Sequence, residues 1–370
     1  MTPGPRRQSS ATWLLLAYLA LVVYASLYPF APWRWPPGLE LDGLLVLPWP
    51  RFFGPFDVQA NLIGYLPLGL LAFAAALRSG RGLRFALLLG LLPWPLLSLL
   101  METLQFFLPG RVPSRSDWLL NSVGAWLGLL LGLLLNRFGG LQRWHDLREY
   151  WFQPNSAAAL ALLALWPLGL LFPTPVPLGV GQWLPRLQEV ALAALDGTPW
   201  TLMWVDAEAP PQRPLPPGLE AIAIALGLLA PVLLALSVAR PGLRRLALVA
   251  GALLLGLLGT TLSTALNFGP QHAWAWVTPA SWPGLAVGAL LASVATPLPR
   301  RVSAALGLVA LSALIALVTQ APADPYMAQS LQAWEQGRFI NLYGLARWIG
   351  WVWPFAALAW LLALIGRRTV

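Results

Sequence analysis

Long apolar segments recur along the whole chain, each of a length suited to crossing a lipid bilayer as a helix. A helix rises about 1.5 Å per residue, so about 20 apolar residues span the roughly 30 Å hydrocarbon core. Two runs, 157–173 and 282–297, are short and contain Pro or Gly, which leaves eight or nine helices as the alternative count. The pattern predicts about ten transmembrane helices, at 11–30, 58–77, 85–108, 118–136, 157–173, 221–239, 246–266, 282–297, 302–319 and 348–366.

The composition of the chain agrees with this pattern. Hydrophobic residues make up 58% of the 370 residues and charged residues only 10%, a balance that is typical of membrane proteins. Backbone polar groups in lipid must be satisfied within the protein, and a helix does this with its own hydrogen bonds. We therefore predict an all-α fold, a polytopic transmembrane helical bundle.

The distribution of arginine predicts the orientation of the helices. The chain has no Lys, and its formal net charge is +9. If the amino terminus is cytoplasmic, 15 of the 23 basic residues fall on the cytoplasmic side, several of them in short loops, where the positive-inside rule is most dependable. We predict that both termini are cytoplasmic and that the basic residues contact membrane lipids, with no nucleic acid as partner. The 15 cytoplasmic residues are Arg6, Arg7, Arg78, Arg81, Arg84, Arg137, Arg143, Arg148, Arg240, Arg244, Arg245, Arg300, Arg301, Arg367 and Arg368.

The longest cytoplasmic loop divides the predicted helices into two groups. Residues 137–156 contain five charged side chains and follow the fourth apolar run. We predict a four-helix membrane module at 1–136 and a cytoplasmic Arg-rich linker at 137–156. Residues 157–370 are then a second membrane module of about six helices, with longer loops on the outer side.

Three pairs of polar residues interrupt the apolar helices of the first module. A polar side chain in a spanning helix is costly without a partner, so such residues often mark a functional site or a polar network. The members of each pair are three or four residues apart and share one helical face. The alternating direction of the helices brings all three pairs to the outer side. The pairs are Asp57 and Asn61, Glu102 and Gln105, and Asp117 and Asn121.

A short loop at 109–117 adds two basic residues, Arg111 and Arg115, to these pairs. Glu102 lies about 9 Å below the end of its helix and needs a partner there, and Arg111 is the expected one. The alternative is a polar clasp that only locks the helices together, with Asp57 and Asp117 as N-caps. We predict one ligand-binding site, made of Asp57, Asn61, Glu102, Gln105, Arg111, Arg115, Asp117 and Asn121.

The ordered set of polar and small residues in the first module resembles the VanZ-like family of bacterial membrane proteins. The resemblance covers about residues 12–136, a third of the chain, and implies a multi-pass protein of the bacterial plasma membrane with a role in the cell envelope. The family is named for a teicoplanin-resistance protein. The resemblance implies no particular reaction, and the later helices depart from the short family members. It rests on Asp57, Asn61, Pro67, Gly69, Glu102, Gln105, Pro109, Arg111, Asp117, Asn121, Gly124 and Gly128.

Glycine and proline predict how the helices of the first module pack. Gly124, Gly128 and Gly132 form a row at four-residue spacing, which lets another helix approach closely. Proline inside a helix removes a hydrogen bond and kinks it. We therefore predict kinks at Pro67, Pro93 and Pro95.

The polar site favours a protein that binds or handles an anionic lipid or glycan precursor at the outer leaflet. Arginine can hold a phosphate, while carboxylate and amide side chains hydrogen-bond a sugar or peptide headgroup. A precursor linked to polyprenyl phosphate fits this chemistry, as does a peptidoglycan precursor. With the resemblance, this suggests a role in tolerance to glycopeptide antibiotics such as teicoplanin.

Two other functions remain open. One is a membrane glycosyltransferase or polymerase of envelope polysaccharide assembly, with Glu102 or Asp117 as the base. The other is a structural or regulatory partner without a small ligand. The chain has no Cys and only two His, and the absence of Lys excludes a Walker-type nucleotide loop, so we expect neither a metal nor a cofactor.

Overall fold

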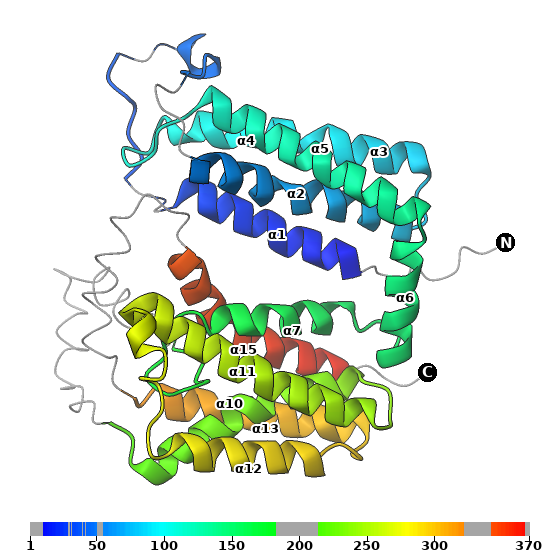
Figure 1. Ribbon diagram of the computed structural model, residues 1–370, viewed down its shortest axis with the longest axis vertical. Coiled ribbons are helices and arrows are strands. Elements are labelled where there is room, and N and C mark those ends of the chain that lie inside the picture. The colour runs from blue at the N-terminus through cyan, green and yellow to red at the C-terminus, as the bar shows by residue number, and fades with distance from the viewer. Residues whose placement is uncertain are drawn as a thin grey trace. The chain divides into compact units, whose positions relative to one another are not determined.

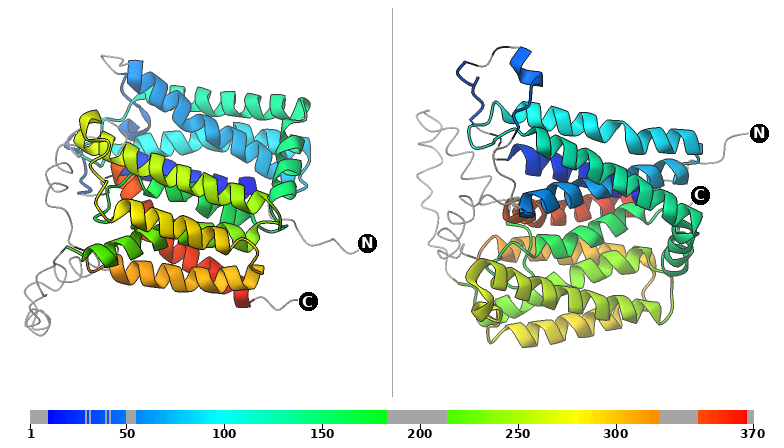
Figure 2. Two further views of the ribbon diagram at one scale, coloured as in Figure 1. Left: turned by 60° about the horizontal axis from the view of Figure 1, so that its bottom comes forward. Right: turned by 45° about the horizontal axis from the view of Figure 1, so that its top comes forward.

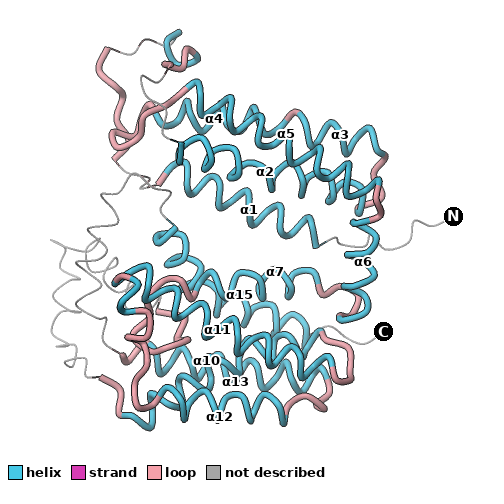
Figure 3. Tube along the Cα trace, viewed as in Figure 1, coloured by secondary structure: helices cyan, strands magenta, loops and turns pink. Residues whose placement is uncertain are grey.

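The computed structural model is built from helices (Figures 1 and 3). It describes residues 10–182 apart from 29, 31, 39, 41 and 50–54, and residues 214–321 and 342–366. Within these ranges the β-structure is limited to one isolated antiparallel bridge, between Phe152 and Ala239. The α-helices are α1 (Ser10–Leu27), α2 (Pro55–Arg78), α3 (Leu83–Leu91), α4 (Pro93–Gln105), α5 (Arg115–Arg137), α6 (Gly140–Trp151), α7 (Ala157–Gly169), α10 (Pro217–Val238), α11 (Arg244–Phe268), α12 (Ser281–Val294), α13 (Arg300–Val318) and α15 (Leu342–Gly366).

The apolar helices match the predicted segments. Seven helices in the described residues are long and apolar enough to cross a membrane. Three shorter apolar helices, Ala11–Leu27, Ala157–Gly169 and Ser281–Val294, account for the other predicted segments, including the two that are short in the sequence. The prediction of an all-helical, polytopic membrane fold is confirmed. The side that each helix end faces stays a prediction.

The predicted segment at 85–108 is broken by proline. α3 ends at Leu91 and α4 begins at Pro93. Pro95 has no N–H to donate to the carbonyl of Leu91, four residues earlier. The indole Nε1 of Trp126 on α5 donates to this carbonyl instead, at 3.0 Å. The break predicted at the two prolines is therefore present, and α5 supplies a hydrogen bond that α4 cannot make.

The chain divides into two compact units. Unit 1 is Met1–Tyr150 with Pro154–Ala161, and unit 2 is Trp151–Gln153 with Leu162–Val370. The segment predicted as a linker contains α6, which runs across the direction of α5 (Figure 1). The side chain of Arg78, at the end of α2, donates to the carbonyl of Leu141 and so fixes the start of α6.

Within unit 1, glycines let the backbones of α2 and α5 come into contact, and both views in Figure 2 show the helices of this unit running side by side. A Cβ added at Gly128 would lie closer than 3.0 Å to the carbonyl oxygen of Leu66. Gly69 on α2 meets the backbone of Ala125 on α5 in the same way. The predicted role of the glycine row, which allows a second helix to approach closely, is thereby confirmed.

In unit 2, α10 is buried along most of its length, and Arg245 of α11 secures its end. Arg245 is 3% exposed and donates to the carbonyls of Ala239 at 3.1 Å, Thr296 at 2.7 Å and Leu298 at 2.8 Å. These carbonyls belong to the end of α10 and to the loop between α12 and α13. Arg245 is therefore not available to lipid headgroups, although its place in a short loop predicted such contact.

Candidate functional site

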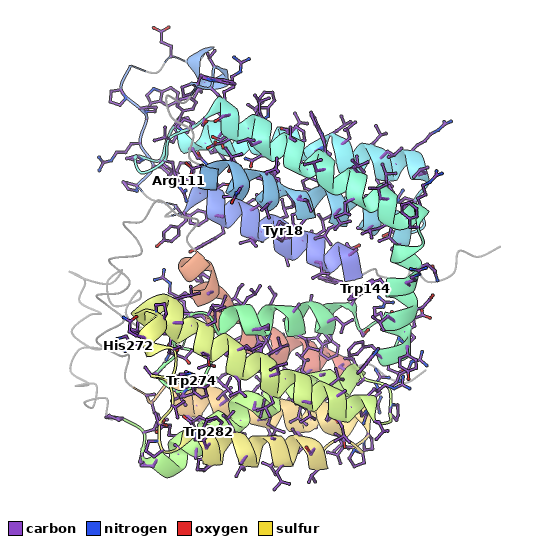
Figure 4. The ribbon with its side chains drawn as sticks, viewed as in Figure 1. Tyr18, Arg111, Trp144, His272, Trp274 and Trp282 are labelled. Carbon is purple, nitrogen blue, oxygen red and sulfur yellow. The ribbon has the colours of Figure 1, made fainter. Side chains whose placement is uncertain are left out.

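The predicted site residues lie at one end of unit 1, on α2, α4, α5 and the loop at 106–114. Figure 4 shows Arg111 at this end, close to where α1 finishes and α2 starts. The deeper residues are buried, whereas two members at the rim are exposed. The buried ones are Glu102, Gln105 and Asn121, the half-buried ones are Asn61, Arg111 and Asp117, and the exposed ones are Asp57 and Arg115.

Glu102 ties the end of α4 to the start of α5. Its Oε2 accepts a hydrogen bond from the backbone N–H of Ser114 at 2.8 Å. Both residues are buried, and the exposed fraction of Glu102 is 4%. A buried N–H without an acceptor is costly, so this contact holds the loop at 106–114 against the helices.

Ser114 also caps α5, and this corrects two expectations. α5 begins at Arg115, and the Ser114 hydroxyl accepts from the N–H of Asp117 at 3.4 Å and contacts the Ser116 hydroxyl at 2.7 Å. Asp117 is therefore inside the first turn of α5, not its N-cap, and Asp57 lies inside the first turn of α2 in the same way. Carboxylates are stabilised at both places by the positive end of the helix dipole.

Arg111 contacts α1, not Glu102. Its Nε donates to the carbonyl of Tyr28 at 2.9 Å, and its Nη2 donates to the carbonyl of Ala25 at 2.7 Å. The last carbonyls of a helix lack partners within the helix, so the planar guanidinium satisfies two acceptors at once. Among the described residues Arg111 and Glu102 form no ion pair, and that expectation was wrong. Burial lowers the pKa of the Arg111 guanidinium, while the charge of Glu102 acts in the opposite direction.

The other predicted residues fall into two groups. Gln105 lies toward α1, because its Nε2 donates to the carbonyl of Ser26 at 3.2 Å. Asp57 and Asn61 lie near enough to Asp117 to act on its carboxylate. Glu102 interacts electrostatically with Asp117 on one side and with Arg111 on the other, and so connects the two groups.

Three further residues belong to this polar region, and the sequence analysis missed them. Asn121 Nδ2 donates to the hydroxyl of Ser98 at 3.0 Å, deeper in the helices than Glu102. Tyr65 and Trp94 lie close by, in one buried cluster. A signal was present: Tyr65 is four residues after Asn61, Ser98 is four before Glu102, and Trp94 is four before Ser98. Each therefore continues a helical face that already carried a polar residue.

Arg115 is an exposed cation of this region, as is Arg34, whose backbone N–H donates to the carbonyl of Phe107. Arg115 is the first residue of α5, and its side chain makes no hydrogen bond or ion pair with a described residue. Where the structure describes the chain, no group of three or more His, Asp or Glu residues could hold a metal ion. The arrangement offers an exposed guanidinium at the rim and hydrogen-bonding groups below it.

Fold and site together define a membrane protein whose first helical unit gathers polar side chains at one end. Residues 14–136 match the model of the VanZ/LLP1 family. The match runs from α1 to the end of α5 and contains all eight predicted site residues, and it confirms the resemblance noted in the sequence. Residues 137–370 lie outside the match. No curated protein and no solved structure matches the chain.

Proposed function

We propose that unit 1 binds an anionic lipid headgroup at the outer leaflet of the bacterial plasma membrane. The observation that carries this proposal is the exposed guanidinium of Arg115 at the start of α5, which pairs with none of the described residues and lies beside the hydrogen-bonded Ser114 and Ser116. A guanidinium matches the geometry of a phosphate, and the N-terminal turn of a helix adds positive potential. The ligand class is a glycan or peptidoglycan precursor linked to polyprenyl phosphate.

The remaining polar residues suit the uncharged part of such a ligand. Asn61 and Asp117 lie near the rim, whereas Glu102 and Asn121 lie deeper. Amide and carboxylate side chains hydrogen-bond hydroxyl and amide groups of a sugar or peptide. Handling of this precursor outside the cytoplasm would explain a role in tolerance to glycopeptides such as teicoplanin.

The orientation of unit 1 is tested by cysteine labelling, because the chain has no Cys of its own. Val112 is 81% exposed in the loop at 106–114, and Ser79 is exposed after the far end of α2. A membrane-impermeant maleimide should label Val112→Cys in intact cells, and should label Ser79→Cys only after the membrane is opened. Labelling of Ser79→Cys alone in intact cells would place the site on the cytoplasmic side and contradict the proposal.

Replacing Arg115 with glutamine should weaken binding of polyprenyl phosphate by purified protein about tenfold, which corresponds to about 1.4 kcal/mol. The charge-assisted contact with phosphate is lost, while none of the described residues loses a side-chain partner. Arg84→Gln is the matched control, because Arg84 is an exposed arginine at the opposite end of unit 1. Equal affinities of the wild type and both variants would show that Arg115 does not hold the phosphate.

A second candidate function is favoured by the contacts of Arg111. Its bonds to the carbonyls of Ala25 and Tyr28, and the bond from Ser114 to Glu102, satisfy these groups without any ligand. In this alternative the polar end only clasps helices, and the protein is a structural or regulatory partner. The enzymatic alternative, with Glu102 or Asp117 as base, is distinguished by turnover of a lipid-linked saccharide by purified protein.

A further inference from the structure

The polar row does not end at Glu102 but continues along the buried side of α4. Ser98 and Trp94 follow at successive four-residue steps, so the row extends about 12 Å along the helix axis. All three side chains are buried in unit 1. From α2, Tyr65 lies near enough to Ser26, Ser98 and Glu102 to interact with them, but its hydroxyl makes no hydrogen bond of ordinary length and angle with a described residue.

Three side-chain atoms on or beside this row are buried and have no hydrogen-bond partner among the described residues. They are the hydroxyl oxygen of Tyr65, the indole Nε1 of Trp94 and the Oδ1 of Asn121. Each of these residues is only 5% exposed. Buried polar atoms nearly always have a hydrogen-bond partner, and the membrane interior offers no solvent to supply one. Three such atoms in one region therefore indicate groups that are kept for a ligand.

The side-chain amide of Asn121 has fewer hydrogen-bond partners than it needs. Its side chain has one hydrogen-bond partner among the described residues, the hydroxyl of Ser98. An amide has a donor end and an acceptor end, so whichever way it is turned, one end lacks a partner. The amide lies beside Ser98, which Tyr65 also approaches.

We propose that Tyr65, Trp94, Ser98 and Asn121 form an inner subsite that binds an uncharged hydroxyl- or amide-bearing group. Trp94 donates only, the Tyr65 hydroxyl donates and accepts, and Asn121 Oδ1 accepts, which is the mixture that a sugar with an acetamido group satisfies. None of the four carries a charge, so a phosphate is not the ligand here. The subsite rests on the proposed function, because it holds the neutral part of a ligand whose phosphate lies at Arg115.

In this proposal the ligand enters between α4 and the start of α5. The break at Pro93 lies at the lower end of the row and supplies a pivot. At the upper end, the hydrogen bond from the Ser114 N–H to Glu102 joins the start of α5 to α4. A ligand that displaces this bond opens the row from its outer end.

The stability of two tyrosine variants gives the first test. The Tyr18 hydroxyl on α1, labelled in Figure 4, donates to the carbonyl of Gly64 at 3.0 Å and is therefore satisfied. Tyr18→Phe should lower the unfolding temperature of the purified full chain, because a hydrogen bond is lost. Tyr65→Phe should leave it unchanged or raise it, because an unpaired hydroxyl is removed. A fall in both variants alike would show that the Tyr65 hydroxyl is already paired, and would overturn the inference.

Binding of two probe lipids by the full chain gives the second test. The probes are polyprenyl phosphate and the same lipid carrying one N-acetylhexosamine. The wild type should bind the sugar-bearing lipid about tenfold more tightly, since the sugar pairs the free atoms. Tyr65→Phe should lose most of this preference and keep the affinity for polyprenyl phosphate, whereas Tyr18→Phe should retain the preference.

The two proposals fail in different ways. Equal wild-type affinity for the two lipids, with no effect of Tyr65→Phe, would overturn the inner subsite and leave the outer phosphate site intact. Binding of neither lipid would overturn the proposed function, and the inner subsite with it.

Discussion

Replacing Gly128 with alanine is expected to prevent α2 and α5 from packing and so to unfold unit 1. The added Cβ would lie closer than 3.0 Å to the carbonyl oxygen of Leu66. Because this neighbour is backbone, no side-chain rotation can relieve the clash, and the helices must separate. We expect a loss of about 4 kcal/mol or more in the free energy of unfolding, at the upper end of single substitutions. Thermal unfolding in detergent, followed by tryptophan fluorescence, measures it.

The matched control is Gly64→Ala on α2. A Cβ at Gly64 would meet nothing within 4 Å. Since alanine is favoured over glycine in a helix by about 1 kcal/mol, this variant should unfold at the same temperature as the wild type or above it. Gly69→Ala, on the same helix as Gly64 but against Ala125, should behave like Gly128→Ala. Equal unfolding temperatures for Gly64→Ala and Gly128→Ala would show that α2 and α5 do not touch through their backbones.

The second large effect is expected at Glu102. Glu102→Leu should lower the free energy of unfolding by about 3 kcal/mol, because the buried N–H of Ser114 loses its acceptor. Glu102→Gln keeps an oxygen that can accept from Ser114 and replaces the other carboxyl oxygen with an NH2 group. We expect this variant to unfold near the wild-type temperature but to bind the sugar-bearing lipid at least tenfold less tightly, about 1.4 kcal/mol or more.

The pair of Glu102 variants separates the candidate functions. If Glu102→Gln is as unstable as Glu102→Leu, the carboxyl group serves the fold and the clasp becomes the better explanation. If it stays folded and loses binding, the ligand site is supported. Turnover of a lipid-linked saccharide by the wild type that disappears in Glu102→Gln would favour the enzymatic alternative.

The sequence by itself determined the helical class and the positions of the apolar helices. Bilayer thickness sets how long an apolar segment must be, and this length is visible in the chain without knowledge of its neighbours. The close approach of a second helix to the glycine row of α5 was equally predictable, because small residues at four-residue spacing let two backbones come together, whereas its identity as α2 came from the structure. The gathering of polar residues at one end of unit 1 also followed, since successive helices alternate in direction.

Only the tertiary structure decided which groups pair. Arg111 binds carbonyls at the end of α1. Ser114, and not Asp117, is the N-cap of α5. The row of buried side chains on α4 extends to Trp94. Each of these facts depends on how a helix is rotated about its axis and on the path of the loop at 106–114. Apolar length does not specify that rotation, because a helix turned by one residue is equally hydrophobic but presents different side chains to its neighbours. The partners of Glu102 and Arg111 are therefore a property of the packed unit.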